Sequence, residues 1–333
     1  MDKGRVSRRH SVLLALTSCA TLSACATASR GSAATLADAG VASTSAFARD
    51  YRTTASRLRD IEASDAFTNT LAICSNPNLQ CAPEISPDAN HAAREDLART
   101  IELRGRAVDA LSSAYSALKA EAAYDAKADI VSATNSAVDA VNSFTSSVLA
   151  LGGAQSAPAA ALISEPLKRI VGFAAGGLAD RAQTRRLKNA SHVISDATLR
   201  LRDALSVEAF VFDGLASHIV EARLSAKQSL LSAGMASNQS IITPLIENLQ
   251  LKPADGLEGT IRKSNANQEA VKAVLAVQSQ AEVEQIRARY AASIKALTEL
   301  LKAHAEFERD EPLSLAELDR FLSGLNVATN PSK

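Results

Sequence analysis

Residues 97–122, LARTIELRGRAVDALSSAYSALKAEA, contain the spacing that decides the fold. Apolar side chains recur at alternating intervals of four and three residues, which places them on one stripe of an α-helix and is typical of coiled-coil seams. Arg104 is the one charged residue on this stripe. The stripe consists of Leu97, Ile101, Arg104, Val108, Leu111, Tyr115, Leu118 and Ala122.

Similar spacing extends in both directions from this stretch. A second phase of the stripe reaches Leu151, so the pattern predicts one helix over about residues 88–151, on the order of 95 Å long. Weak helix formers from Thr134 to Ser136 mark the place where that helix would break. Further long helices are expected over about residues 35–70, 164–236 and 262–309, and a proline-containing loop is expected over 74–87.

The composition agrees with a fold made only of helices. Hydrophobic residues make up 47% of the chain but aromatic residues only 4%, and Ala and Leu, both strong helix formers, dominate the apolar set. Alanine-rich cores bury little area per residue and therefore need long interfaces. We expect an all-α fold: an elongated antiparallel bundle of three to four long helices with coiled-coil-like seams, forming a single domain over residues 34–333.

The first 25 residues have the layout of an export signal. Its apolar run, Ser11 to Leu22, has twelve residues, well short of the roughly 20 that a spanning helix needs. Four basic residues precede this run, and a Leu-Ser-Ala-Cys sequence closes it. They are Lys3, Arg5, Arg8 and Arg9, followed by Leu22, Ser23, Ala24 and Cys25.

This segment resembles a bacterial lipoprotein signal peptide that ends in a lipobox. The resemblance implies that residues 1–24 are removed, that Cys25 receives a diacylglyceryl thioether and that its new amino group is acylated. Residues 25–33 would then be a lipidated tether, and the lipid would hold the protein on a membrane. Because Ala26 replaces the aspartate that retains such lipoproteins at the inner membrane, the resemblance implies the outer membrane, facing the periplasm.

Two alternatives for the signal remain open. A second box ends at Cys19, but it leaves only Ser11 to Leu16 as the apolar core, so Cys25 is preferred. Arg8 and Arg9 also suggest twin-arginine export. Against that route, Ser11 stands where such signals usually carry a large apolar residue.

Cys74 and Cys81 are the two cysteines left after Cys19 is removed and Cys25 is lipidated. In an oxidising periplasm, a spacing of seven residues favours a structural disulfide. The alternative is a redox or metal-binding pair. Catalytic thiols favour two intervening residues rather than six, and no histidine lies closer than His91.

The sequence contains no motif that predicts catalysis. It has no phosphate-binding glycine loop, no paired-histidine zinc helix and no glycine-flanked nucleophilic serine. Each histidine after the signal has an acidic residue about one turn further on, which is typical of a solvated helix face rather than a metal or proton-transfer site. The pairs are His91 with Glu95, His192 with Asp196, His218 with Glu221, and His304 with Glu308. We therefore predict no catalytic residues, no metal ligands and no cofactor.

Two further segments have a functional and a structural interpretation. Gly172, Gly176 and Gly177 suggest membrane insertion, oligomerisation or, preferably, a tight helix crossing. A basic stretch suggests lipid head groups, an acidic partner or nucleic acid, but acidic residues are interleaved and no aromatic accompanies it, so a solvated face is preferred. This stretch comprises Arg181, Arg185, Arg186, Lys188, Arg200 and Arg202.

Together these features predict a lipid-anchored cell-envelope protein that acts as a structural or protein-interaction module, not an enzyme. Removal of residues 1–24 takes four basic residues and one acidic residue, so the formal charge falls from zero to −3 and no nucleic-acid partner is expected. An envelope protein or a second copy is the expected partner. The first alternative is a bundle that binds an apolar small molecule or lipid near Gly172 to Gly177, and the second is an enzyme with an unfamiliar site.

Overall fold

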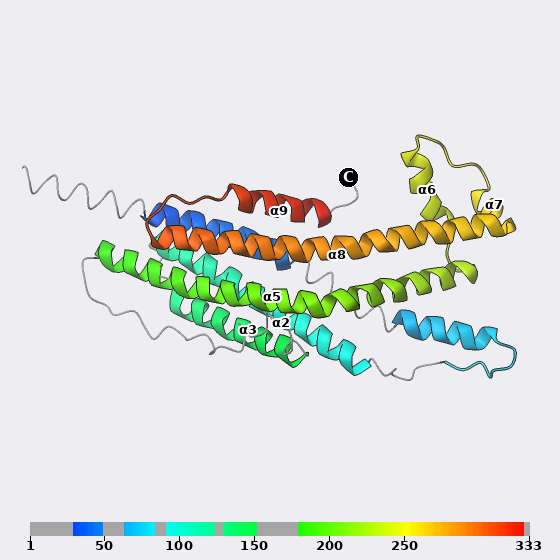
Figure 1. Ribbon diagram of the computed structural model, residues 1–333, viewed down its shortest axis with the longest axis horizontal. Helices are drawn as coiled ribbons and strands as arrows, with labels where there is room; N and C mark the ends of the chain where they lie inside the picture. Colours follow the sequence, from blue (N-terminus) through cyan, green and yellow to red (C-terminus); the bar gives the residue numbers. More distant parts are fainter. Residues whose placement is uncertain (1–28, 49–62, 84–90, 124–128, 152–178, 330–333) are drawn as a thin grey trace, which may run out of the picture.

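The computed structural model describes residues 29–48, 63–83, 91–123, 129–151 and 179–329 (Figure 1). These residues form helices and connecting turns and contain no strand, so the expected all-α class is confirmed. The helices are segment 29–48, segment 63–75, α2 (His91–Ala122), α3 (Ile130–Ala150), α5 (Ala179–Ser232), α6 (Gln239–Asn248), α7 (Leu257–Lys263), α8 (Asn265–Glu308) and α9 (Ala316–Thr329).

Helices α5 and α8 run antiparallel along the length of the molecule (Figure 1). Near one end of the pair, the Lys188 ammonium lies 2.7 Å from the Asp310 carboxylate, and further along Arg223 pairs with Glu282. The 54 residues of α5 make it about 80 Å long. The other helices pack around this pair.

The predicted single helix over residues 88–151 is wrong, because the chain forms two helices there. Helix α2 ends at Ala122 and α3 begins at Ile130, and the two pack against each other, with the Thr100 and Ser147 hydroxyls 2.6 Å apart. Folding back brings their two apolar stripes together, whereas one straight helix would separate them. The expected break at Thr134 lies inside α3, where its hydroxyl donates to the carbonyl of Ile130.

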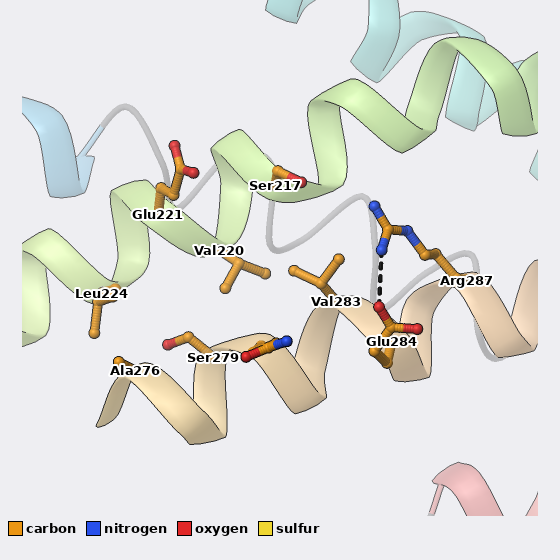
Figure 2. A pocket seen from close by; sticks show the side chains of 10 residues that line it. Ser217, Val220, Glu221, Leu224, Ala276, Ser279, Val283, Glu284 and Arg287 are labelled. Carbon is orange, nitrogen blue, oxygen red and sulfur yellow. Dashed lines mark hydrogen bonds and ion pairs between the residues drawn. The ribbon is translucent and has the colours of Figure 1, made fainter. Parts of the chain in front are cut away.

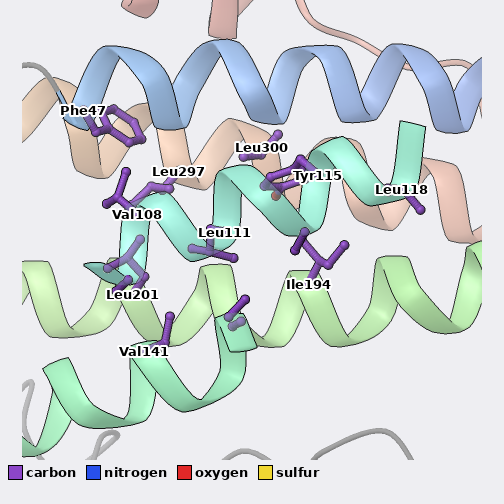
Figure 3. Packing of buried hydrophobic residues seen from close by; sticks show 14 of the residues in the cluster. Phe47, Val108, Leu111, Tyr115, Leu118, Val141, Ile194, Leu201, Leu297 and Leu300 are labelled. Atoms are coloured by element: carbon purple, nitrogen blue, oxygen red, sulfur yellow. The ribbon is translucent and has the colours of Figure 1, made fainter. Parts of the chain in front are cut away.

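The main core lies between segment 29–48, α2, α3, α5, α8 and α9. Figure 3 shows side chains of this core from several helices, including Phe47, Val108, Ile194 and Leu297, all of which are fully buried. Small residues allow the helices to approach closely. At Gly40, a Cβ would lie 2.2 Å from the Tyr115 ring, so this contact requires glycine.

The predicted tether over residues 25–33 needs a boundary correction. Residues 29–33 are helical and Ala33 is completely buried in the main core. The small, polar composition of this stretch suggested a linker. Ala33 instead packs in the main core. Further along the same helix, Asp38 pairs with Lys119 at 2.6 Å.

Beyond the main core, α5 and α8 continue together toward α6 and α7 (Figure 1). Among the described side chains of α5, Val207 is the last hydrophobic residue of the main core, and Tyr290 is the first residue of α8 that packs against that core. We call residues 210–288 the arm. At its far end, α6 and α7 pack on a second, smaller cluster built on Ile261, Val271 and Leu275.

The tip of the arm is closed by local chemistry. Gly234, after α5, and Gly256, before α7, both adopt the left-handed conformation, with φ of 73°. The carboxylate of Glu258 accepts hydrogen bonds from the side chains of Ser237 and Arg262 and thereby ties the loop before α6 to α7. Helix α6 begins at Gln239 and ends at Asn248.

Several sequence predictions fall on other parts of the chain. The signal peptide, Cys19 and Cys25 lie outside the described residues, as do Gly172, Gly176 and Gly177. The Cys74 and Cys81 sulfurs are 2.00 Å apart, at bonding distance. Within the described residues, none of the helices combines the length and hydropathy needed to cross a membrane.

Candidate functional site

A chain of polar side chains crosses the main core through His304. The Nε2 atom of His304 lies 2.8 Å from the Tyr115 hydroxyl, and Nδ1 lies 2.8 Å from the Ser191 hydroxyl. Beyond these contacts, Tyr115 reaches the Thr198 hydroxyl at 3.1 Å, and Ser191 donates to the Glu308 carboxylate at 3.3 Å. This network of polar side chains links α2, α5 and α8, and Glu308 is its one member at the surface.

Burial controls the protonation of His304 and Tyr115 in this network. Loss of solvation lowers the pKa of His304 to about 3, because the charged imidazolium is disfavoured in the core. Burial likewise raises the pKa of Tyr115, although the hydrogen bond with Thr198 opposes that shift. The imidazole is therefore neutral near pH 7, with one ring nitrogen donating and the other accepting.

The contact between Ser191 and His304 has the separation of a nucleophile and its general base. Both side chains are 0% exposed, however, and Tyr115 rather than a carboxylate occupies the second ring nitrogen. A substrate has no access to the Ser191 hydroxyl in this arrangement. The cluster therefore fixes the register of three helices by satisfying buried polar groups.

A second buried polar layer joins the same helices through Arg104. The Arg104 Nη1 atom donates to Glu208 Oε2 at 2.8 Å and also to the Tyr290 hydroxyl, and both charged side chains are 0% exposed. The guanidinium carbon lies 5.3 Å from the centre of the Tyr290 ring, within cation–π range. Arg104, Glu208 and Tyr290 come from α2, α5 and α8, respectively.

The ion pair between Arg104 and Glu208 contributes more to the alignment of the helices than to the free energy of folding. Burial raises the pKa of Glu208, while the charge and the hydrogen bond of Arg104, together with Tyr290, oppose that rise. A buried pair loses much of its hydration energy, so its net contribution is small, but removal of either partner leaves an uncompensated charge. The pair thus favours one alignment of α2, α5 and α8.

An open groove lies between α5 and α8 in the arm. It has a volume of about 310 Å³ and is lined by apolar, small and charged side chains. Figure 2 shows Val220 and Val283 pointing toward each other across it, with the pair of Glu284 and Arg287 at one rim. The lining consists of Ser217, Val220, Glu221, Leu224, Ala276, Ser279, Gln280, Val283, Glu284 and Arg287.

Large apolar side chains are exposed mainly on the arm. Eight such residues occur in the described part of the chain, and six of them fall within residues 210–288. The six on the arm are Phe210, Met235, Leu245, Leu249, Leu251 and Val277, while Leu79 and Leu199 lie elsewhere. Four of these six, Met235, Leu245, Leu249 and Leu251, fall within 17 residues in and around α6.

The histidines differ from the predicted solvated pattern. His192 is 65% exposed and lies near Asp196 and Glu308, as the one-turn spacing predicted. His304 is instead fully buried, so the solvated interpretation is wrong for it. The side chains of His91 and His218 lie outside those described. In the described residues, no three His, Cys, Asp or Glu side chains form a group that could hold a metal ion.

The basic stretch of α5 is only partly solvated. Lys188 and Arg202 have 28% exposed side chains and pair with Asp310 and Asp203. Arg186 is 44% exposed and lies 3.2 Å from Glu121. Burial lowers the pKa of Arg200, with Asp203 opposing the shift. These pairs neutralise much of the positive charge that the sequence shows.

Sequence reasoning missed the partners of Arg104 and the burial of His304. Arg104 occupies a position on the apolar stripe, so its place in the core was a usable signal, but Glu208 lies 104 residues away and nothing local predicts the pairing. His304 lies three residues before Phe307, which is also buried, so its spacing from that residue was the corresponding signal. Comparisons with protein-family models, curated proteins and solved structures found no match for this chain.

Proposed function

We propose that this chain is a lipid-anchored cell-envelope protein that acts as a structural or protein-interaction module. The observation that carries the proposal is the concentration of exposed apolar side chains on the arm. The lipobox that ends at Cys25 supports the anchor and, with Ala26 after it, an outer-membrane location facing the periplasm. The arm would be the interaction end of the module.

The proposal treats residues 34–333 as one elongated domain with a bundle of three to four long antiparallel helices. In such a domain, the buried layers around His304 and Arg104 keep the helices in one register. Segment 29–48, in blue, lies toward the end of the bundle opposite α6 and α7 (Figure 1). A lipid at Cys25 would therefore leave the arm pointing away from its attachment point.

The test is crosslinking in native membranes followed by capture of the intact protein. We expect a defined envelope protein, or a second copy, to be enriched with the wild type and lost in the unanchored variant Cys25→Ala. A variant with Leu245→Asp and Leu249→Asp on the arm should lose the same partner while it remains anchored. Equal capture by wild type and arm variant would contradict the assignment of the interaction to the arm.

The groove favours a second candidate function, the binding of an apolar small molecule or lipid. Its volume of about 310 Å³ and the side chains of Val220, Leu224 and Val283 suit a small apolar ligand. Native mass spectrometry of the purified chain should then show a retained molecule that is lost in Val283→Asp. Absence of any bound molecule from both proteins would eliminate this alternative.

A further inference from the structure

The end of the molecule opposite segment 29–48 exposes apolar side chains from two stretches of the chain (Figure 1). Leu79 is 52% exposed within residues 74–83, and four residues are 45% to 64% exposed within residues 235–251. The two stretches lie far apart in the sequence, and we call them together the far end. The four exposed residues of the second stretch are Met235, Leu245, Leu249 and Leu251.

The stretch that carries Leu79 has a fixed shape. Each of residues 74–83 is exposed, and a disulfide closes the turn that they form. The backbone N–H of Asn78 donates to the side-chain oxygen of Asn76 at 3.0 Å, and the N–H of Leu79 donates to the carbonyl of Asn76 at 3.1 Å. A contact at Leu79 therefore costs little conformational entropy, because the turn is ordered beforehand.

In the second stretch, the apolar face of α6 extends beyond the cluster on which the helix packs. Ile241 packs against the smaller cluster, whereas Leu245 and Leu249 follow it at intervals of four residues and are exposed. Residues four apart share one face of a helix, so one apolar stripe is covered at its start and exposed at its end. No residue of α6 is buried.

The composition of the far end suits lipid better than protein. Aromatic residues and arginine dominate the energy of protein–protein contacts, while leucine and serine are under-represented there. Neither residues 74–83 nor residues 235–251 contain an aromatic residue or an arginine. Their exposed leucines stand among neutral Asn, Gln and Ser residues. The boundary between lipid head groups and acyl chains buries such apolar side chains and keeps the polar ones hydrated.

The charges near the far end are few and balanced. Residues 66–83 and 228–246 contain no charged residue, and residues 227–263 contain four basic and three acidic residues in all. Binding of a basic segment to anionic head groups needs a cluster of positive charge. Apolar contact would therefore supply the affinity for lipid, and that affinity should depend little on salt or on lipid charge.

We propose that the far end contacts a lipid bilayer, with Leu79 and the exposed side chains around α6 inserted between head groups and acyl chains. This inference goes beyond the proposed protein-interaction function, because it assigns a lipid surface to this end of the molecule. The two stretches contact the bilayer together, since both lie toward the same end (Figure 1).

The test uses single tryptophans as local reporters in the full-length chain, which contains no tryptophan of its own. The probe is phosphatidylcholine vesicles with bromine atoms on the acyl chains, which quench a tryptophan that reaches them. Emission of Leu79→Trp and Leu249→Trp should be quenched at least twofold, equally at low and high salt. The control is Leu199→Trp, at an exposed position in the body, which should not be quenched. Circular dichroism checks that each variant is folded.

A second measurement uses the unmodified chain, because tryptophan itself favours the bilayer interface. Phosphatidylcholine vesicles should slow amide hydrogen exchange in residues 74–83 and 235–251. Exchange in residues 309–315, which form the turn between α8 and α9, should stay the same.

Absence of quenching at Leu79→Trp or at Leu249→Trp, equal quenching at Leu199→Trp, or unchanged exchange in the far end would overturn the inference. If lipid contact fails while the arm still captures an envelope protein from native membranes, the proposed interaction function stands. If lipid contact is found and no protein is captured, the inference stands and the proposed interaction function is wrong.

Discussion

At the scale of single residues, the buried polar groups determine how stability responds to change. His304, Arg104 and Glu208 are ionisable residues whose side chains are 0% exposed. Each has hydrogen-bond partners on other helices. Substitution at any of them therefore affects several helices at once.

His304 predicts a loss of stability in mild acid. Its pKa is about 3 in the folded chain and about 6.5 when unfolded, so between these values the unfolded chain binds a proton that the folded chain does not. The free energy of unfolding should fall by about 1.4 kcal/mol per pH unit below pH 6.5 from this group. Urea unfolding from pH 8 to pH 5 should show a shallower fall for His304→Gln, while His192→Gln, at an exposed position, should follow the wild type.

The buried pair of Arg104 and Glu208 gives a second prediction. Arg104→Met should lower the free energy of unfolding by about 3–5 kcal/mol, because it leaves the Glu208 carboxyl buried without its counter-charge. The double variant Arg104→Met, Glu208→Leu should recover much of that loss. The control is Arg99→Met, since Arg99 and Glu95 are 66% and 63% exposed and such pairs contribute about 0–1 kcal/mol. Equal effects at the two arginines in urea unfolding would refute the assignment.

Gly40 gives a third prediction at this scale. Gly40→Ala should lower the free energy of unfolding by about 1–3 kcal/mol, because the new methyl group would meet the Tyr115 ring, which hydrogen bonds with Thr198 and His304 hold in place. Gly105→Ala is the control in α2, where a Cβ would meet nothing within 4 Å. There the helix propensity of alanine should stabilise the protein slightly. Thermal unfolding of the two variants distinguishes these outcomes.

At the scale of the element, α8 is one continuous helix with two environments. Its residues from Ser293 onward lie in the main core, and those before Tyr290 belong to the arm. The spacing of apolar residues in α8 does not predict the two environments, because it does not indicate how many helices pack against each part. The effect of a side-chain truncation on folding stability should therefore depend on its position along α8.

Truncation along α8 tests that division. Leu297→Ala should lower the free energy of unfolding by about 2–5 kcal/mol, because Leu297 is fully buried in the main core. Val277→Ala in the arm should change the folding stability of each chain by less than about 0.5 kcal/mol, since Val277 is 69% exposed. Denaturant unfolding at low protein concentration measures both. A large effect at Val277 under these conditions would mean that the arm is covered within one chain.

At the scale of the whole molecule, segment 29–48 and the tip of the arm lie toward opposite ends. The described chain starts at one end of the bundle, and α6 and α7 form the tip at the other (Figure 1). A surface that is used for binding benefits from this separation, because the membrane then leaves it accessible. The two cysteines of the signal region make the anchor directly testable.

Cys25→Ser should abolish lipidation, whereas Cys19→Ser should not. The expected readout is incorporation of a labelled fatty acid together with recovery in the membrane fraction, both lost in Cys25→Ser alone. Retention of the label in Cys25→Ser and its loss in Cys19→Ser would move the processing site to the alternative box. Absence of the label from the wild-type protein would contradict a lipid at either cysteine.

Local sequence patterns were enough to predict the all-α class and the approximate extent of α8. The intervals of four and three residues, the abundance of Ala and Leu and the scarcity of aromatics depend only on local geometry and helix propensity. The bounds of α8 differ from the expected 262–309 by only a few residues. The basic start, the apolar run and the cysteine at residue 25 likewise form a local pattern that predicts processing.

The reversal of the chain after α2 and the partners of the buried polar residues depend on contacts between helices that are distant in the sequence. Helices α2 and α3 are separate because their apolar stripes pack against each other. Helix propensity suggested a break at Thr134 instead, and this residue lies inside α3. The partners Arg104 and Glu208 lie 104 residues apart, and Tyr115 and His304 lie 189 apart. The stripe places a residue on the inner face of its helix, but burial and protonation depend on which other helices cover that face, and this is why His304 is enclosed while Val277 is exposed.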